Sequence, residues 1–188
     1  MPADSNPVHE IRRLAAVVPI RLEAEAFPHN LQIGPPQALH TLTIFTDPAC
    51  GPCRTKIEAW TRNLPSGIRL VHKYWPVDKT NIGSGLVLEL ARRHGLAEDM
   101  HRAIGNRPGD ISEENLFNLL DAAGLPLADQ QRELTDNVAD LTATVGRDID
   151  QGTTLGLGAP PQLILDDYLI DGEVLNPSRL ATYIERLN

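Results

Sequence analysis

Two cysteines separated by two residues are the feature of this sequence most able to do chemistry. Cys50 and Cys53 are its only cysteines. They directly follow residues 41–46, a β-branched and apolar run that predicts a buried strand. They directly precede residues 54–60, a predicted helix with Ile57 and Trp60 on one face. The sequence therefore places Cys50 where a strand gives way to a helix.

The first turn of a helix stabilises a thiolate, because its backbone N–H groups lack partners and the helix dipole is positive there. We therefore expect the pKa of Cys50 to lie below that of a free thiol and predict Cys50 as the attacking nucleophile. Cys53 follows one turn later on the same side, so it would resolve a mixed disulfide and release the partner. Pro52 suits the first helical turn, where its missing N–H costs nothing.

Other roles for a Cys-x-x-Cys pair compete with this one. A zinc site needs further ligands, and the chain has neither a second cysteine pair nor a His-x-x-x-His cluster. An iron–sulfur cluster shared across a dimer is a similar alternative. An inert disulfide is a third, although a four-residue loop removes little entropy from the unfolded chain. We predict a redox pair and no bound metal.

Composition limits the class of protein. With 188 residues and 41% hydrophobic residues, the chain forms one domain, or one domain with an insertion, around a real core. The net charge of −8 and the lack of a basic run argue against a nucleic-acid partner. No stretch approaches a transmembrane span. The first residues do not resemble a signal peptide, so the chain as written is expected to be cytoplasmic, or periplasmic or otherwise extracytoplasmic if it is a processed mature form.

The elements around the cysteines predict a layered α/β domain. Residues 68–75 alternate as a second strand, so strand, helix and strand form a parallel βαβ unit. Residues 1–40 are an N-terminal extension, with a short helix at 9–18 and an edge strand at 31–33. Residues 158–165 and 168–172 are two runs split by Asp166-Asp167, which predict a hairpin, and Asn176 caps a last helix.

Residues 77–152 have a different, helical pattern. Short helices are expected at 84–94 and 96–104, and Ser112 or Asp110 caps the next one. A long helix follows, with Leu134, Val138 and Leu141 on its apolar stripe. The charged residues of this block are interpreted as its solvated surface.

This order of elements resembles the thioredoxin superfamily, and the helical block resembles the insertion of its DsbA-type branch. The matching motifs are residues 41–60, around Cys50-Gly51-Pro52-Cys53, and residues 158–172, around a pair of prolines. The resemblance implies a thioredoxin fold, in which a central mixed sheet is flanked by helices. Residues 41–76 and 153–188 would form that domain, and residues 77–152 an inserted all-helical subdomain.

The resemblance also implies a function, a thiol–disulfide oxidoreductase that exchanges the Cys50–Cys53 dithiol/disulfide with protein substrates. No bound cofactor is needed, and an upstream redox partner is a further candidate. In the superfamily, the residue before a cis-proline lends its backbone N–H and C=O to the partner strand. We expect that proline to be Pro160, which makes Ala159 the binding residue. If Pro161 were cis, Pro160 would have to serve, although it has no N–H.

Two positions depart from the family pattern. Gly51 and Pro52 stand between the cysteines where the DsbA branch has Pro-His, which favours a less oxidising couple. Ile44 stands six residues before Cys50, where the superfamily often buries an acid that handles the proton of the resolving thiol. Asp47 is the nearest acid in sequence, but the turn is expected to expose it. Proton transfer at Cys53 would then depend on water.

A second hypothesis is a non-catalytic thioredoxin-type binding module that holds a protein partner or a metal through the cysteine pair. A transferase of the glutathione-using type is a third, against which the retention of both cysteines counts. The sequence does not predict the direction of electron flow.

Overall fold

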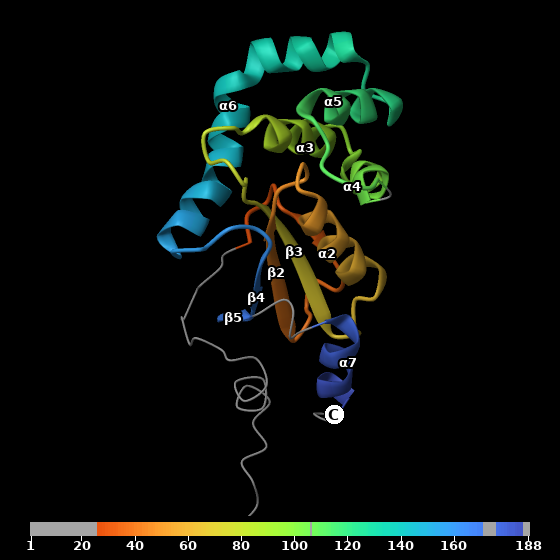
Figure 1. Cartoon of the computed structure of the whole chain (residues 1–188), viewed down its shortest axis with the longest axis vertical. Helices are drawn as coiled ribbons and strands as arrows, with labels where there is room; N and C mark the ends of the chain where they lie inside the picture. Colours follow the sequence, from red (N-terminus) through yellow and green to blue (C-terminus); the bar gives the residue numbers. More distant parts are fainter. Residues whose placement is uncertain (1–25, 106, 171–175, 186–188) are drawn as a thin grey trace, which may run out of the picture.

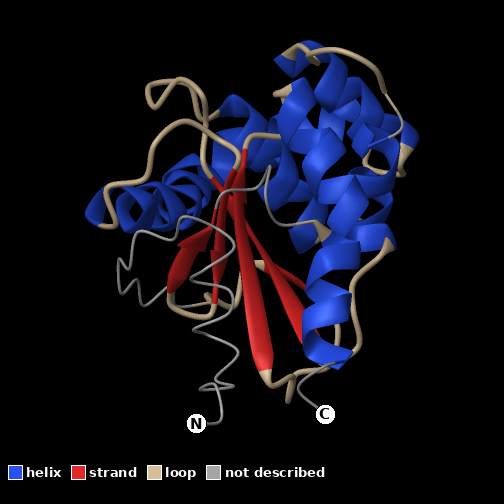
Figure 2. Ribbon diagram, turned by 60° about the horizontal axis from the view of Figure 1, so that its bottom comes forward, coloured by secondary structure: helices blue, strands red, loops and turns tan. Residues whose placement is uncertain are grey.

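The described part of the chain forms one mixed sheet of five strands, in the order β1-β3-β2-β4-β5. Figures 1 and 2 show how this sheet is packed against the helices. The computed structural model describes residues 26–105, 107–170 and 176–185, so the helix expected at 9–18 lies outside the described residues. β2 and β3 are parallel, and the other neighbours are antiparallel. The predicted βαβ unit, edge strand and hairpin are thereby confirmed. The strands are β1 (Leu31–Ile33), β2 (His40–Thr46), β3 (Ile68–Tyr74), β4 (Gln162–Leu165) and β5 (Tyr168–Ile170).

Helices cover both faces of the sheet. They are α2 (Gly51–Arg62), α3 (Gly83–Arg93), α4 (Ala97–Gly105), α5 (Glu113–Ala122), α6 (Leu127–Thr154) and α7 (Pro177–Glu185). Trp60 of α2 and Leu180 of α7 pack on one face, in a cluster that includes Ile44 of β2. On the other face Phe45 and Trp75 form a second cluster, to which α6 contributes Ile149. Side chains of β2 alternate between these two clusters, as a strand requires.

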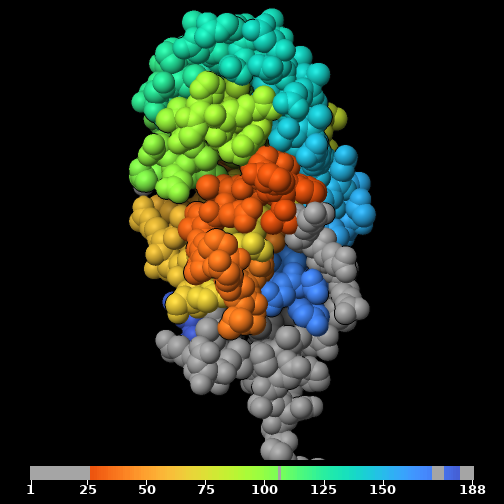
Figure 3. All heavy atoms as spheres, turned by 180° about the vertical axis from the view of Figure 1, so that it is seen from behind, coloured from red at the N-terminus to blue at the C-terminus, as the bar shows by residue number. Residues whose placement is uncertain are grey.

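The helices α3 to α6 form a block with its own apolar core beyond one end of the sheet (Figures 1 and 3). The prediction that Val138 lies on the buried stripe of the long helix is wrong, because its side chain is 51% exposed. The helical path is interrupted at Asn137, with φ −125° and ψ 15°. This kink rotates the faces of the two halves relative to each other, and Leu141 is fully buried beyond it. None of the helices described is long and apolar enough to cross a membrane.

A buried ion pair joins the sheet to α6. The side chain of Lys73 is fully buried, with Nζ 3.2 Å from Oδ1 of Asp148. Lys73 also donates to Oδ1 of Asn30 at 2.9 Å. Asn30 Nδ2 donates to both oxygens of Asp148, at 3.0 and 2.9 Å, and the backbone N–H of Tyr74 donates to Oδ2 at 2.9 Å. The segment before β1, the strand β3 and the helix α6 are thus held by one polar cluster.

Candidate active site

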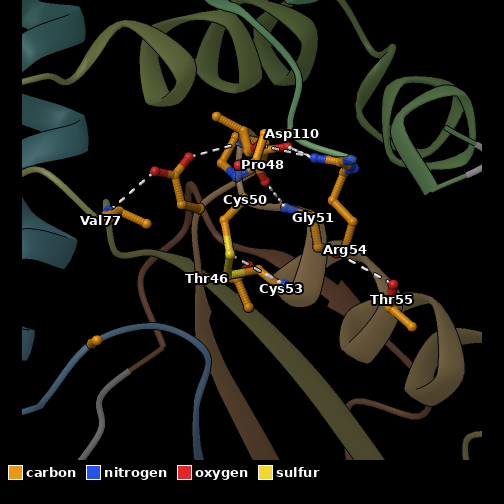
Figure 4. The surroundings of a disulfide bond; sticks show 12 residues. Thr46, Pro48, Cys50, Gly51, Cys53, Arg54, Thr55, Val77 and Asp110 are labelled. Carbon is orange, nitrogen blue, oxygen red and sulfur yellow. Dashed lines mark hydrogen bonds between the residues drawn. A yellow bond between two sulfur atoms is a disulfide. The ribbon is translucent and has the colours of Figure 1, made fainter. Parts of the chain in front are cut away.

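The two cysteines form a disulfide at the start of α2 (Figure 4). Cys50 is the N-cap residue, with extended φ −80° and ψ 118°. Its Sγ accepts a hydrogen bond from the backbone N–H of Cys53 at 3.3 Å. Cys50 is half-buried, whereas Cys53 is 0% exposed. A partner can therefore reach the sulfur of Cys50. The N-terminus of α2 would stabilise that sulfur as a thiolate.

Asp47 fixes the turn between β2 and α2. The prediction that this side chain is exposed is wrong, since it is only 6% exposed. Its Oδ1 accepts hydrogen bonds from the N–H of Ala49 and the hydroxyl of Ser84, both at 2.9 Å. Its Oδ2 accepts from the N–H of Val77 at 3.1 Å. These donors replace water around the carboxylate, which allows the turn to bury it.

Arg54 ties the cysteine turn to the helical block. Its guanidinium donates to the carbonyl oxygens of Pro48 and Ala49, at 3.1 and 2.9 Å, and to those of Arg107 and Gly109 across the site. Burial lowers the pKa of Arg54, partly offset by nearby carboxylates. The sequence analysis missed this residue. The signal was available, because Arg54 falls on the buried face of α2 with Cys53, Ile57 and Trp60.

Asp110 supplies a cap from a distant part of the chain. Its Oδ1 accepts the N–H of Gly51, the first amide of α2, at 2.7 Å. Of the two predicted caps of α5, Ser112 has that role, since its hydroxyl accepts the N–H of Asn115 at 3.3 Å. A Cβ at Gly51 would lie 3.2 Å from both Asp110 and Gly109. Glycine at this position thus permits the close approach of the loop from the helical block.

A groove of about 440 Å³ opens beside Cys50. The start of α2, the loop after β3 and the loop before α5 form its walls. Its lining includes Cys50, Pro52, Val77, Asp78, Asp110 and Glu113. Val77, in the loop after β3, is 64% exposed and gives this wall an apolar surface. The helical block therefore forms one side of the approach to the cysteine pair.

The loop that contains Pro160 and Pro161 joins the sheet at the end where the cysteine turn lies. Gln162 at the start of β4 pairs with Phe45 near the end of β2, so residues 159–161 lie beyond that pair, toward the cysteine turn. The cis peptide bond joins Pro160 to Pro161. The prediction that Pro160 is the cis residue is therefore wrong. The sequence offered two adjacent prolines, and side-chain pattern does not distinguish which bond isomerises. Trp75 Nε1 anchors this loop by donating to the carbonyl of Gly158 at 2.7 Å.

A pair of histidines behind the site also escaped the sequence analysis. The hydroxyl of Thr46 is 2.5 Å from His72 Nε2, and His72 Nδ1 is 3.0 Å from His101 Nε2. Their sequence positions carry no common spacing, so only the fold brings them together. Across the part of the chain that is described, no group of three or more His, Cys, Asp or Glu side chains is placed to hold a metal ion.

Known proteins of similar structure identify the fold of this chain. No family model and no curated protein matches the sequence. Several solved structures, however, have a similar fold. A thioredoxin-like oxidoreductase from Silicibacter pomeroyi DSS-3 is 23% identical with a TM-score of 0.70, over 86% of this chain and 93% of that one. This chain has the thioredoxin fold of the DsbA-like proteins.

Two further thioredoxin-fold structures have similar scores. The thiol-disulfide exchange protein alpha-DsbA2 from Wolbachia pipientis is 16% identical with a TM-score of 0.66, over 98% of this chain and 95% of that one. The catalytic domain of Proteus mirabilis ScsC is 16% identical with a TM-score of 0.66, over 88% of this chain and 92% of that one. The predicted fold, with its inserted helical subdomain and its Cys-x-x-Cys disulfide, is confirmed.

Proposed function

We propose that this protein exchanges its Cys50–Cys53 dithiol/disulfide with thiols or disulfides of other proteins. The asymmetry of the pair is the observation that carries the proposal: Cys50 lines an open groove at a helix N-terminus, and Cys53 is fully buried one turn later. Such an arrangement separates an attacking sulfur from a resolving one. Solved structures of the same fold include proteins described as an oxidoreductase and as a thiol-disulfide exchange protein.

The reaction proceeds through two exchanges. In the reduced protein, the Cys50 thiolate attacks a partner disulfide, which forms a mixed disulfide and releases one partner thiolate. Cys53 then loses its proton and attacks Cys50 Sγ, which forms the Cys50–Cys53 disulfide and releases the second partner thiolate. Both released thiolates take up protons, and two electrons have passed to the partner. Reversal of these steps oxidises a partner dithiol, and the cysteine pair itself carries the electrons.

Ala159 and Pro160 are proposed to contact the partner polypeptide. They precede β4 at the end of the sheet where Cys50 lies, and Ala159 is exposed. Because Pro161 is the cis residue, Pro160 precedes it and offers a carbonyl but no N–H. The N–H of Ala159, one residue earlier, is then the donor that a partner strand would use. The Ala159 carbonyl accepts a hydrogen bond from Gln162 Nε2 at 2.5 Å. Ala159→Pro removes the N–H. We expect weaker binding of a protein substrate and an unchanged rate with glutathione disulfide, which is too small to need the strand contact.

Gly51 and Pro52 are proposed to set the redox poise of the pair. Pro52 is exposed on the first turn of α2 and stands between the two cysteines in sequence. A histidine there would add a donor near the Cys50 thiolate and stabilise the reduced form. Pro52→His should therefore make the couple more oxidising in a titration against glutathione. An unchanged equilibrium constant would contradict this role for the intervening dipeptide.

A redox titration and a trapping experiment test the function. The wild-type pair should interconvert with glutathione, and its equilibrium constant tells whether the protein acts as a reductant or as a disulfide donor. Cys53→Ser should accumulate mixed disulfides through Cys50, and Cys50→Ser should form none. If the pair does not cycle while the protein still binds a partner, a non-catalytic binding module replaces the enzyme.

A further inference from the structure

Cys53, the resolving cysteine, must lose its thiol proton at a buried position with little access to water. Cys53 is 0% exposed, and its exchange reactions begin or end with a thiol at its Sγ. The apolar Ile44, also 0% exposed, stands six residues before Cys50 and offers no acid or base. Asp47 already accepts three hydrogen bonds at the turn. Another group must therefore move this proton if exchange is to be fast.

Thr46 lies on the correct face of the sheet to reach Cys53. Side chains alternate along β2, so Thr46 shares a face with Ile44, which packs in one cluster with Trp60 of α2. Cys53 belongs to the buried side of the same helix. Figure 4 draws Thr46 among the residues that surround the disulfide. The Thr46 side chain is 2% exposed, so a buried hydroxyl stands at the end of β2, next to the turn that carries the cysteine pair.

A line of hydrogen bonds leads outward from this hydroxyl. Thr46 Oγ1 is 2.5 Å from His72 Nε2 on β3, and His72 Nδ1 is 3.0 Å from His101 Nε2 on α4. His72 is 6% exposed, but His101 is only partly buried. His101 also lines a surface cavity of about 420 Å³ with Ile57, Glu58, Glu98 and Arg102. The three side chains therefore lead from the buried end of β2 to a surface cavity between α2 and α4.

We propose that Thr46, His72 and His101 form a proton relay that serves the Sγ of Cys53. This inference deepens the function proposed above and depends on it. Thr46 would exchange the proton with the thiol, and the two histidines are positioning and relay residues that act through Thr46. The relay would supply the group for proton transfer that Ile44 does not provide.

The protonation of the histidines suits a relay. Burial lowers the pKa of His72 well below its ordinary value, with a further contribution from His101, and burial lowers the pKa of His101 to about 4. Both rings are therefore neutral near pH 7. A neutral imidazole has one N–H donor and one acceptor nitrogen, so each ring can accept a proton on one side and release one on the other.

The proton balance closes over a complete cycle. When Cys53 attacks Cys50, its proton passes to Thr46 Oγ1, the hydroxyl proton passes to His72 Nε2, the Nδ1 proton of His72 passes to His101 Nε2, and His101 releases a proton to water. When the disulfide is reduced again, Cys53 leaves as a thiolate and receives a proton by the reverse transfers. Each half-cycle thus restores the tautomers that the other half-cycle needs.

Thr46→Val and Thr46→Ser form a matched test. Valine keeps the shape and removes the hydroxyl, whereas serine keeps the hydroxyl and removes the methyl. Reduced protein mixed with a chromogenic aromatic disulfide should release one thiolate when Cys50 attacks and a second when Cys53 resolves. We expect Thr46→Val to slow the second release roughly 10- to 100-fold and to leave the first unchanged, with Thr46→Ser within about twofold of the wild type.

The two releases also separate this inference from the proposed function. If no first release occurs, thiol exchange itself fails. If the first release is normal and Thr46→Val resolves as fast as the wild type, or if Thr46→Ser is as slow as Thr46→Val, the relay is wrong and Thr46 only packs. His101→Ala gives an independent check, because free imidazole should restore its slowed second release. Failure of imidazole to restore that rate would overturn the role of His101.

Discussion

Replacing Lys73 by methionine should strongly destabilise the protein, because it removes the buried lysine charge that pairs with the carboxylate of Asp148. The side chains of Lys73 and Asp148 are 0% and 3% exposed. Removal of one member of a buried ion pair costs about 3–5 kcal/mol. Asp148 would keep its hydrogen bonds with His29, Asn30 and the N–H of Tyr74, which favours the lower end, about 3 kcal/mol.

The effect has a definite pH dependence. Burial raises the pKa of Asp148, but hydrogen bonds from His29 and Asn30 and the charge of Lys73 outweigh it, so the pKa lies below its ordinary value of 3.8. A carboxyl whose folded-state pKa is lowered stabilises the fold above its unfolded-state pKa, and this contribution is lost as the pH falls through the folded value. The cost of Lys73→Met should therefore be full at neutral pH and shrink in acid, where Asp148 is protonated in both proteins.

Guanidinium unfolding of the oxidised protein provides the assay. Trp60 and Trp75 are 0% and 2% exposed, so their fluorescence reports loss of the core. A loss of about 3 kcal/mol should lower the midpoint denaturant concentration without changing the m-value and lower the Tm by roughly 6–12 °C. In the double variant Lys73→Met/Asp148→Asn, much of the loss should be recovered. A cost below about 1 kcal/mol for the single variant, or additive costs in the double variant, would refute the reasoning.

Two further predictions concern the site and its support. Asp110→Asn keeps an acceptor for the first amide of α2 but removes a negative charge near Cys50. The reduced form should therefore gain about 0.7 kcal/mol, which shifts the glutathione equilibrium about threefold toward a more oxidising couple. A shift in the opposite direction would contradict the electrostatic argument. Gly152→Ala should destabilise the protein by about 1–3 kcal/mol, because the new Cβ would lie 2.5 Å from the Trp75 ring. In the same unfolding assay, Gly146→Ala in the same helix should stabilise it by up to about 1 kcal/mol, because no atom lies within contact distance of that Cβ.

The reactive pair and the class of fold were accessible from sequence because both depend on local patterns. A Cys-x-x-Cys motif between a buried strand and a helix specifies the position of Cys50 without knowledge of the rest of the chain. Strand alternation and helical stripes predicted the βαβ unit, the helical block and the hairpin, since each pattern reflects which side chains face a core. The error at Val138 shows the limit of this reasoning, because a single non-helical residue moved the stripe.

The surroundings of the cysteines were decided by tertiary structure. Asp110 reaches the first amide of α2 from 59 residues away, and Arg54 joins two loops whose proximity no local pattern records. The exposure of Asp47 was mispredicted because two of its three donors, Val77 and Ser84, come from residues that follow β3.

The sequence by itself determined which atoms react and on what kind of scaffold, because strand and helix periodicity and the spacing of two cysteines are properties of neighbouring residues. Only the tertiary structure decided which cysteine is fully buried, which proline bond is cis and which side chains form the hydrogen-bonded line from Thr46 to His101. Those features depend on contacts between Thr46, His72 and His101, residues on three different elements, and such contacts exist only once the sheet and the inserted helices have packed together.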